Sequence, residues 1–277
     1  MARAIERIER DIAALKEAIR AIAVELQSAY ASYLNTLGLT LRKQLILASY
    51  HLCTQGYPEN FLNLSLNQRQ QLQQAIRNLG QVAGEKLLAC IQSEEVGGDE
   101  GDEEVTSSFS LSSGLLDTSN SQSFTADTSN PIELVKWQQN LEEVTQEILK
   151  KLSHDANVLI QKSGVLPKKL PEPILAAAAA AASEASGEVM PGPPNLLNLV
   201  IEIENEQQSE DSGLTQIMAI NLRLGEIEFA DVTLSSERRQ IRSTLVKLNK
   251  LGREYQKRHQ EKAIAEAEAA WRASWFE

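Results

Sequence analysis

The clearest pattern in the sequence is an apolar seam near the start of the chain. Apolar residues recur in alternating steps of three and four, with charged residues between them. This is the a/d pattern of a coiled coil sustained over about four heptads, and it predicts one long helix. Packing within the chain and pairing with another molecule both explain it. The seam consists of Ile5, Ile8, Ile12, Leu15, Ile19, Ile22 and Leu26, continued by Ala29 and Tyr33.

Two more helices are predicted before residue 93. We expect Gly38 to end the first helix and Thr40–Gln55 to form the second, followed by a turn at residues 56–60. Ser65 followed by Gln68 is a capping-box pattern, so a third helix should begin one residue after Ser65. Short loops favour antiparallel neighbours, and residues 1–93 are therefore predicted to be an N-terminal helical region.

Residues 94–129 differ sharply in composition from the flanking segments. Acidic residues without a basic one come first, and a Ser/Thr-rich stretch with few apolar residues follows. Such a segment buries too little surface to offset its ordering entropy, so a disordered linker is predicted. The spacing of the carboxylates does not match a calcium-binding EF-hand loop. The acidic residues are Glu94, Glu95, Asp99, Glu100, Asp102, Glu103 and Glu104.

Residues 130–277 are predicted to be a second, C-terminal helical region. Asn130 is a good N-cap, Pro131 suits the first helical position, and Glu133 completes a capping box. Gly164 is expected to end this helix. Proline-rich connectors at 165–173 and 191–194 flank a segment whose alanines favour helix.

The pattern is ambiguous between residues 196 and 229. Alternate apolar positions from 218 to 224 are typical of a strand, whereas apolar residues from 214 to 227 also fit one side of a helix. We expect two helices separated by a polar loop at residues 205–213. A small β-hairpin within 196–229 is the alternative.

The last helix is predicted to run for about 40 residues to Trp275, beyond the usual globular length. Three interpretations of its basic residues compete. They are a solvated surface, a docking site for an acidic partner or for the chain's own acidic segment, and a nucleic-acid-binding surface. Nucleic acid is disfavoured because Tyr255 is the only aromatic residue within the basic stretch and the whole chain carries a net charge of −11. The cations are Arg238, Arg239, Arg242, Lys247, Lys250, Arg253, Lys257, Arg258 and Lys262.

Three aromatic residues, Trp271, Trp275 and Phe276, follow the basic stretch. Docking onto the protein's own helices explains them, and so does an anchor for a partner protein, because tryptophan is enriched at binding hot spots. Contact with a membrane interface is a third explanation.

The sequence contains no motif that predicts catalysis. The histidines His51, His154 and His259 lack metal-site spacing, no cysteine pair has zinc spacing, and no phosphate-binding glycine loop occurs. We therefore expect no catalytic residue, no metal, no cofactor and no enzyme activity. Cys53 and Cys90 are expected to be buried thiols of a cytosolic chain. Neither a transmembrane helix nor a signal peptide is predicted, which favours a cytoplasmic location.

Three stretches resemble a family of uncharacterised cyanobacterial helical proteins. They are residues 222–231 (LRLGEIEFAD), residues 251–257 with 271–275 (LGREYQK and WRASW), and residues 44–51 (QLILASYH). The resemblance covers both ordered ends of the chain. The resemblance implies no particular activity. It implies a location in a bacterial cytoplasm, with the thylakoid surface as an alternative.

Together these patterns predict an all-α fold, a helical bundle with long coiled-coil-like N- and C-terminal helices that pack together and a disordered acidic linker. The leading hypothesis for function is a non-catalytic protein-interaction or assembly factor, and the alternative is a regulatory nucleic-acid-binding protein. A protein partner or a second copy is expected, with peripheral membrane contact as an alternative. The partner-binding candidates are Ile5, Ile8, Ile12, Leu15, Ile19, Ile22, Arg238, Arg239, Arg242, Arg253, Arg258, Trp271, Trp275 and Phe276.

Overall fold

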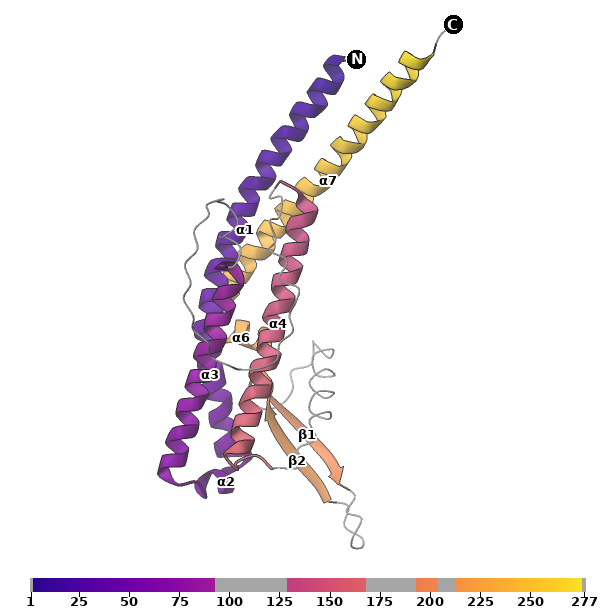
Figure 1. Cartoon of the computed structure of the whole chain (residues 1–277). Coiled ribbons are helices and arrows are strands. Elements are labelled where there is room, and N and C mark those ends of the chain that lie inside the picture. The colour runs from indigo at the N-terminus through magenta and orange to yellow at the C-terminus, as the bar shows by residue number, and fades with distance from the viewer. Residues whose placement is uncertain (1, 93–128, 168–192, 204–212, 276–277) are drawn as a thin grey trace, which may run out of the picture.

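Four long helices build the protein, as the computed structural model shows (Figure 1). They are α1 (Ala2–His51), α3 (Leu66–Gln92), α4 (Pro131–Lys162) and α7 (Val232–Ser274). The structure describes residues 2–92, 129–167, 193–203 and 213–275, and only the backbone at 2–4, 92, 199–203 and 213–216. The acidic linker and the alanine-rich segment, for which we predicted disorder and helix, therefore lie outside the described residues. Within the described residues the fold is all-α, as predicted, apart from one hairpin.

Helix α1 does not end at Gly38, and the prediction of a break there is wrong. The helix, 50 residues long in all, runs past Gly38 to His51 and passes into a π-helical turn, η1 (Leu52–Gly56). The physical reason lies on α3, because a Cβ built on Gly38 would come 3.1 Å from the Cα of Gly84. Gly38 thus permits the close approach of two helices rather than ending one. The predicted second helix is the last part of α1 together with η1.

The predicted start of α3 is confirmed. A short helix, α2 (Pro58–Leu62), forms within the expected turn region and precedes it. The backbone N–H of Ser65 donates to Oε1 of Gln68 at 2.8 Å, and the N–H of Gln68 donates back to Oγ of Ser65 at 3.3 Å. This reciprocal capping box satisfies two N–H groups that a helix start would otherwise leave without partners.

The predicted bounds of α4 are also confirmed. The side-chain oxygen of Asn130 accepts the N–H of Ile132 at 3.1 Å, and Pro131 occupies the first helical position. Beyond the other end of the helix Gly164 adopts a φ of +90°, a conformation that glycine reaches without strain.

The expectation of two helices between residues 196 and 229 is wrong for most of that segment. An antiparallel hairpin forms instead from β1 (Leu196–Ile203) and β2 (Gly213–Ile220), and only α6 (Leu224–Ala230) is helical. In the register, Leu196 lies opposite Ile220. The alternative of a small hairpin therefore holds.

Side chains from the helices stabilise the hairpin at the outer edge of β2. The Tyr57 hydroxyl accepts the N–H of Met218 at 3.1 Å and donates to its carbonyl at 3.3 Å. The Asn157 amide accepts the N–H of Ile220 at 2.8 Å and donates to its carbonyl at 2.9 Å. These bonds replace those of a neighbouring strand, which a two-stranded ribbon otherwise lacks.

Helix α7 runs antiparallel to α1 and packs along it, as expected for the first and last helices. Asp231 caps α7 by accepting the N–H of Thr233 at 2.9 Å, and its other oxygen accepts a hydrogen bond from Thr40 on α1. Helices α3 and α4 contact each other. Helix α3 also packs on α1, and α4 also contacts α7. The first part of α1 and the last part of α7 extend together beyond α3 and α4 (Figure 1).

A continuous apolar core joins all four long helices and the near end of the hairpin. Leu26 and Leu41 of α1, Leu87 of α3, Leu134 of α4 and Leu248 of α7 are almost completely buried. In the part of the chain that the structure describes, no helix is both long enough and apolar enough to cross a membrane.

Candidate functional site

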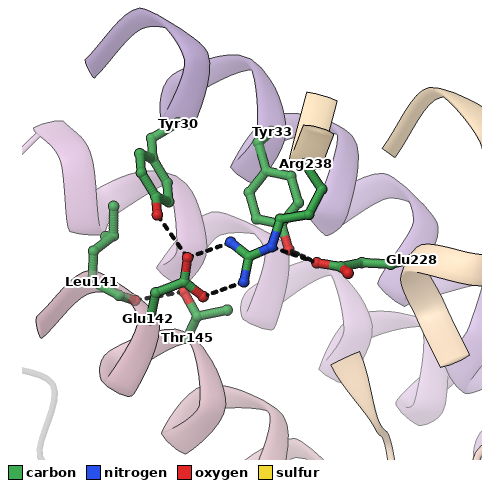
Figure 2. A network of polar contacts seen from close by, with 7 residues as sticks. All are labelled: Tyr30, Tyr33, Leu141, Glu142, Thr145, Glu228 and Arg238. Carbon is green, nitrogen blue, oxygen red and sulfur yellow. Dashed lines mark hydrogen bonds and ion pairs between the residues drawn. The ribbon is translucent and has the colours of Figure 1, made fainter. Parts of the chain in front are cut away.

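The most buried ion pairs among the described residues form a polar network at the junction of α1, α4, α6 and α7 (Figure 2). Arg238 of α7 forms a two-pronged ion pair with Glu142 of α4, with Nη2 and Oε2 2.8 Å apart. Its Nε lies 3.2 Å from Oε1 of Glu228 on α6. The guanidinium also lies 5.3 Å from the ring centre of Tyr33, within range of a cation–π contact. Arg238 therefore links three helices through one side chain.

Two tyrosines of α1 complete the network by donating to its carboxylates. The Tyr30 hydroxyl donates to Oε1 of Glu142 and the Tyr33 hydroxyl to Oε1 of Glu228, each at 2.6 Å. One turn along α4 from Leu141, Thr145 donates to the Leu141 carbonyl at 2.7 Å, so its hydroxyl is satisfied within the helix (Figure 2). The arrangement is a charge-assisted clamp between four helices.

The electrostatics of this network argue against acid–base or nucleophilic chemistry. Burial acts to raise the pKa of Glu142, but hydrogen bonds from Arg238 and Tyr30 outweigh it and hold the pKa below its usual value. Burial, followed by the hydrogen bonds to the two carboxylates, raises the pKa of Tyr30 and Tyr33 well above the usual range. Glu142, Arg238 and the two tyrosines are thus held in their usual charge states at neutral pH, whereas a catalytic group needs a pKa near the working pH.

Further polar contacts lie along the α1–α7 interface. Glu25 of α1 accepts hydrogen bonds from Thr244 at 3.0 Å and Lys247 at 3.2 Å, which lower its pKa. Towards the other end of the interface, Ser32 and Thr36 of α1 both donate to Glu237. These bonds fix the antiparallel register of the two helices.

The apolar seam predicted on α1 faces α7 of the same chain. Three of the partner-binding candidates in it are buried, with 7% of Ile12, 0% of Ile19 and 9% of Ile22 exposed. The other candidates in it are only half-buried, and near the start of α1 the facing positions of α7 include Arg258 and Lys262. These two cations lie 3.6 Å from Asp11 and 2.7 Å from Glu9, respectively. The half-buried members of the seam are Ile5, Ile8 and Leu15.

The predicted basic residues of α7 fall into two groups. Arg238 and Arg258, with Lys247 and Lys262, form ion pairs across helices, so they serve the protein's own packing. The remaining five are exposed, and none of them forms an ion pair with a described residue. We call these five the basic stripe; they are Arg239, Arg242, Lys250, Arg253 and Lys257.

The tryptophans near the end of α7 are exposed. Trp271 and Trp275 stack on each other with ring centres 5.5 Å apart, and 66% and 62% of their surfaces remain open to solvent. Ile264 precedes them at a spacing of seven residues and is 52% exposed. We call Ile264, Trp271 and Trp275 the apolar tip. Phe276, the remaining candidate, lies outside the described residues.

The basic stripe and the apolar tip share one face of α7. At about 100° per residue, their positions fall within an arc of roughly 80°. That arc is opposite the side that packs on α1, where Ile241 and Leu248 are completely buried. The outward face of α7 therefore carries cations first and large apolar side chains after them.

Neither Cys53 nor Cys90 forms a disulfide, and no metal centre is found among the described residues. Cys53 is buried, as predicted, and burial raises the pKa of its thiol to about 11. Cys90 is only half-buried, which differs from the prediction, because it packs against the edge of the core rather than inside it.

The ion-pair network was missed in the sequence because its members come from distant segments. Tyr30 and Glu142 are 112 residues apart, and each alone is unremarkable on a helix. A usable signal was the position of Tyr30 and Tyr33 at the end of the apolar seam, where a buried hydroxyl needs a hydrogen-bond partner.

Comparison of the chain with protein-family models, with curated proteins and with solved structures found no match. The resemblance to cyanobacterial proteins therefore stays a prediction.

Proposed function

We propose that the protein is a non-catalytic assembly factor that binds a partner protein through the apolar tip of α7. The observation that carries this proposal is the exposure of Trp271 and Trp275 on the face directed away from α1. Large aromatic side chains contribute most to binding when they enter a pocket of a partner. Clustered apolar exposure of this kind is typical of an interaction surface.

The spacing within the tip indicates how the partner would receive it. Ile264, Trp271 and Trp275 stand at positions i, i+7 and i+11 of one helix. This is the arrangement of anchors by which an amphipathic helix enters a hydrophobic groove. At the margin of the tip, Arg272 lies 3.6 Å from Glu268, which gives it a polar rim. The partner surface would be an apolar groove with a polar edge.

The absence of catalysis is part of the proposal. The buried network consists of ion pairs and hydrogen bonds among its own members, and its tyrosines are held far from ionisation. Stabilisation of the helix junction explains this network without a reaction.

The test replaces both tryptophans by alanine, W271A/W275A, and compares the variant with V246A. Val246 is 69% exposed on the same face of α7 and is a matched control. We expect the melting temperature to stay within about 2 °C for both variants, because exposed side chains contribute little to stability. In extracts of native cells, size-exclusion chromatography should show the wild type and V246A in a larger assembly and W271A/W275A outside it. A lower melting temperature of W271A/W275A, or an unchanged elution, would contradict the proposal.

A further inference from the structure

The basic stripe is a surface whose charge is left uncompensated by the rest of the described protein. All five side chains are exposed, and the ion pairs of α7 involve other cations. Glu254 is the only acidic residue of α7 within residues 239–257, and it forms no ion pair with the stripe. From Arg239 to Lys257 the stripe extends for about 27 Å along the helix, at about 1.5 Å per residue.

We propose that the acidic segment Glu94–Glu104 of the same chain docks on the basic stripe. Charge complementarity is the first argument, since this segment holds seven carboxylates and no basic residue. Several opposite charges facing one another along a helix are favourable as a set even where each exposed pair alone contributes little.

The attachment of the segment to the fold is the second argument. The chain after the segment enters α4 at Pro131, whose Cβ lies 3.4 Å from the position of a Cβ on Gly252 of α7. Gly252 is at the level of Lys250 and Arg253 along α7, on the side of the helix that contacts the start of α4. The residues between Glu104 and Pro131 can span at most about 90 Å when extended, at about 3.3–3.6 Å each, so the whole stripe is within reach.

The acidic segment is also attached at its start, where it follows the end of α3, and this attachment is at a similar level along α7. Gly84 of α3 contacts Gly38 of α1, and α3 continues antiparallel to α1 to Gln92. This brings the end of α3 level with the part of α1 near Tyr30, which contacts α7 through Glu142 and Arg238. Both attachments are thus at the level of the stripe along α7, and a segment tethered at both ends has a high effective concentration at surfaces within its reach.

The experiment is zero-length cross-linking of the full chain with a carbodiimide, which joins a carboxylate to a lysine amine with loss of water. Peptide mapping by mass spectrometry would then locate the links. We expect Lys250 and Lys257 to be linked to carboxylates of residues 94–104. Two pairs of the fold are internal controls, because Lys247 lies 3.2 Å from Glu25 and Lys262 lies 2.7 Å from Glu9.

Salt provides the second condition of this experiment. Raising NaCl from about 20 mM to about 0.5 M shortens the Debye length roughly fivefold, and we expect the yield of the Lys250 and Lys257 links to fall about tenfold. The proposal is overturned if the control links form while Lys250 and Lys257 link to no carboxylate of the segment. It is also overturned if isotope-labelled mixtures show that the links join different molecules.

A variant in which the seven carboxylates become amides gives an independent measurement. The variant is E94Q/E95Q/D99N/E100Q/D102N/E103Q/E104Q, and the probe is a heparin column. We expect the variant to be retained to a higher salt concentration than the wild type, and the further change R253E/K257E to abolish that gain. When the acidic segment keeps its seven carboxylates, we expect R253E/K257E and the wild type to elute at the same salt concentration. The reason is that the segment already covers the stripe in the wild type. Strong binding of the wild type to heparin through the stripe would show that it is open to polyanions such as nucleic acid, and would overturn the proposal.

Discussion

Arg238 of α7 and Glu142 of α4 form a two-pronged ion pair in which only 17% and 16% of the two side chains are exposed. The pair joins helices that are far apart in sequence, and Tyr30 adds α1 to it. Charges buried to this extent are costly unless they are paired and hydrogen-bonded, and here both conditions are met. The junction of the helices is therefore the most sensitive point of the fold.

The first prediction is that Arg238→Met destabilises the protein by about 3 kcal/mol, because it leaves Glu142 buried without its counter-ion. Urea unfolding at pH 7 measures the effect. The neighbouring exposed Arg239→Met is the control and should change stability by less than about 0.5 kcal/mol. The double variant R238M/E142L should recover part of the loss, because it removes the Glu142 charge together with its counter-ion while Glu228 still lacks one. Equal stability of R238M and R239M would refute the clamp.

The second prediction concerns acid. Because the pKa of Glu142 is held below its ordinary value, its ionised form stabilises the folded state. That contribution is complete above the pKa of an unfolded-state glutamate, about 4.3, and is lost as the pH falls through the lower folded-state value. We expect the free energy of unfolding to fall more steeply below about pH 4.3 in the wild type than in Glu142→Gln. Parallel curves from urea unfolding at several pH values would contradict this assignment.

The third prediction compares the two glycines at the α1–α3 contact. A Cβ on Gly84 would lie 3.6 Å from the Cα of Gly38, an ordinary contact, whereas one on Gly38 would lie 3.1 Å from the Cα of Gly84. Gly84→Ala should therefore raise the free energy of unfolding by about 0.5–1 kcal/mol through helix propensity. Gly38→Ala should raise the free energy of unfolding by less than Gly84→Ala does, or should lower it. Gly38→Leu should lower it by about 1–3 kcal/mol through overpacking. Thermal and urea unfolding measure all three, and equal effects of the two alanines would disprove the close approach.

The fourth prediction tests the anchors of the hairpin. Asn157→Ala leaves the buried N–H and carbonyl of Ile220 without their side-chain partner. We expect the amide of Ile220 to exchange with solvent about tenfold faster, because an unsatisfied buried group costs about 1–3 kcal/mol. Tyr57→Phe is the matched variant and should act first on Met218. Hydrogen exchange read by NMR separates the two amides, and identical profiles would show that neither side chain acts as a strand substitute.

The sequence was most informative where structure depends on neighbouring residues. Ser65 with Gln68, and Asn130 with Pro131, marked helix starts that the structure confirms. Their partners lie within one helical turn, so a short stretch of sequence contains the whole interaction.

Long-range contacts determined the features that were predicted wrongly or missed. Gly38 looks like a helix breaker until Gly84 is placed against it. The hairpin could not be distinguished from helices by its apolar pattern, and the bonds from Tyr57 and Asn157 that favour it come from elsewhere in the chain. Which cations of α7 are paired likewise depended on carboxylates of α1, α4 and α6.

The central claim is that the apolar tip of α7 contacts another protein, and site-specific photo-cross-linking in native cells tests it most directly. A photoreactive phenylalanine analogue would replace Trp271 in one strain and Val246, equally exposed on the same face, in another. We predict a discrete cross-linked species of higher mass from position 271 and none from position 246. Cross-links from position 271 that remain within the chain, or the same products from both positions, would contradict the account.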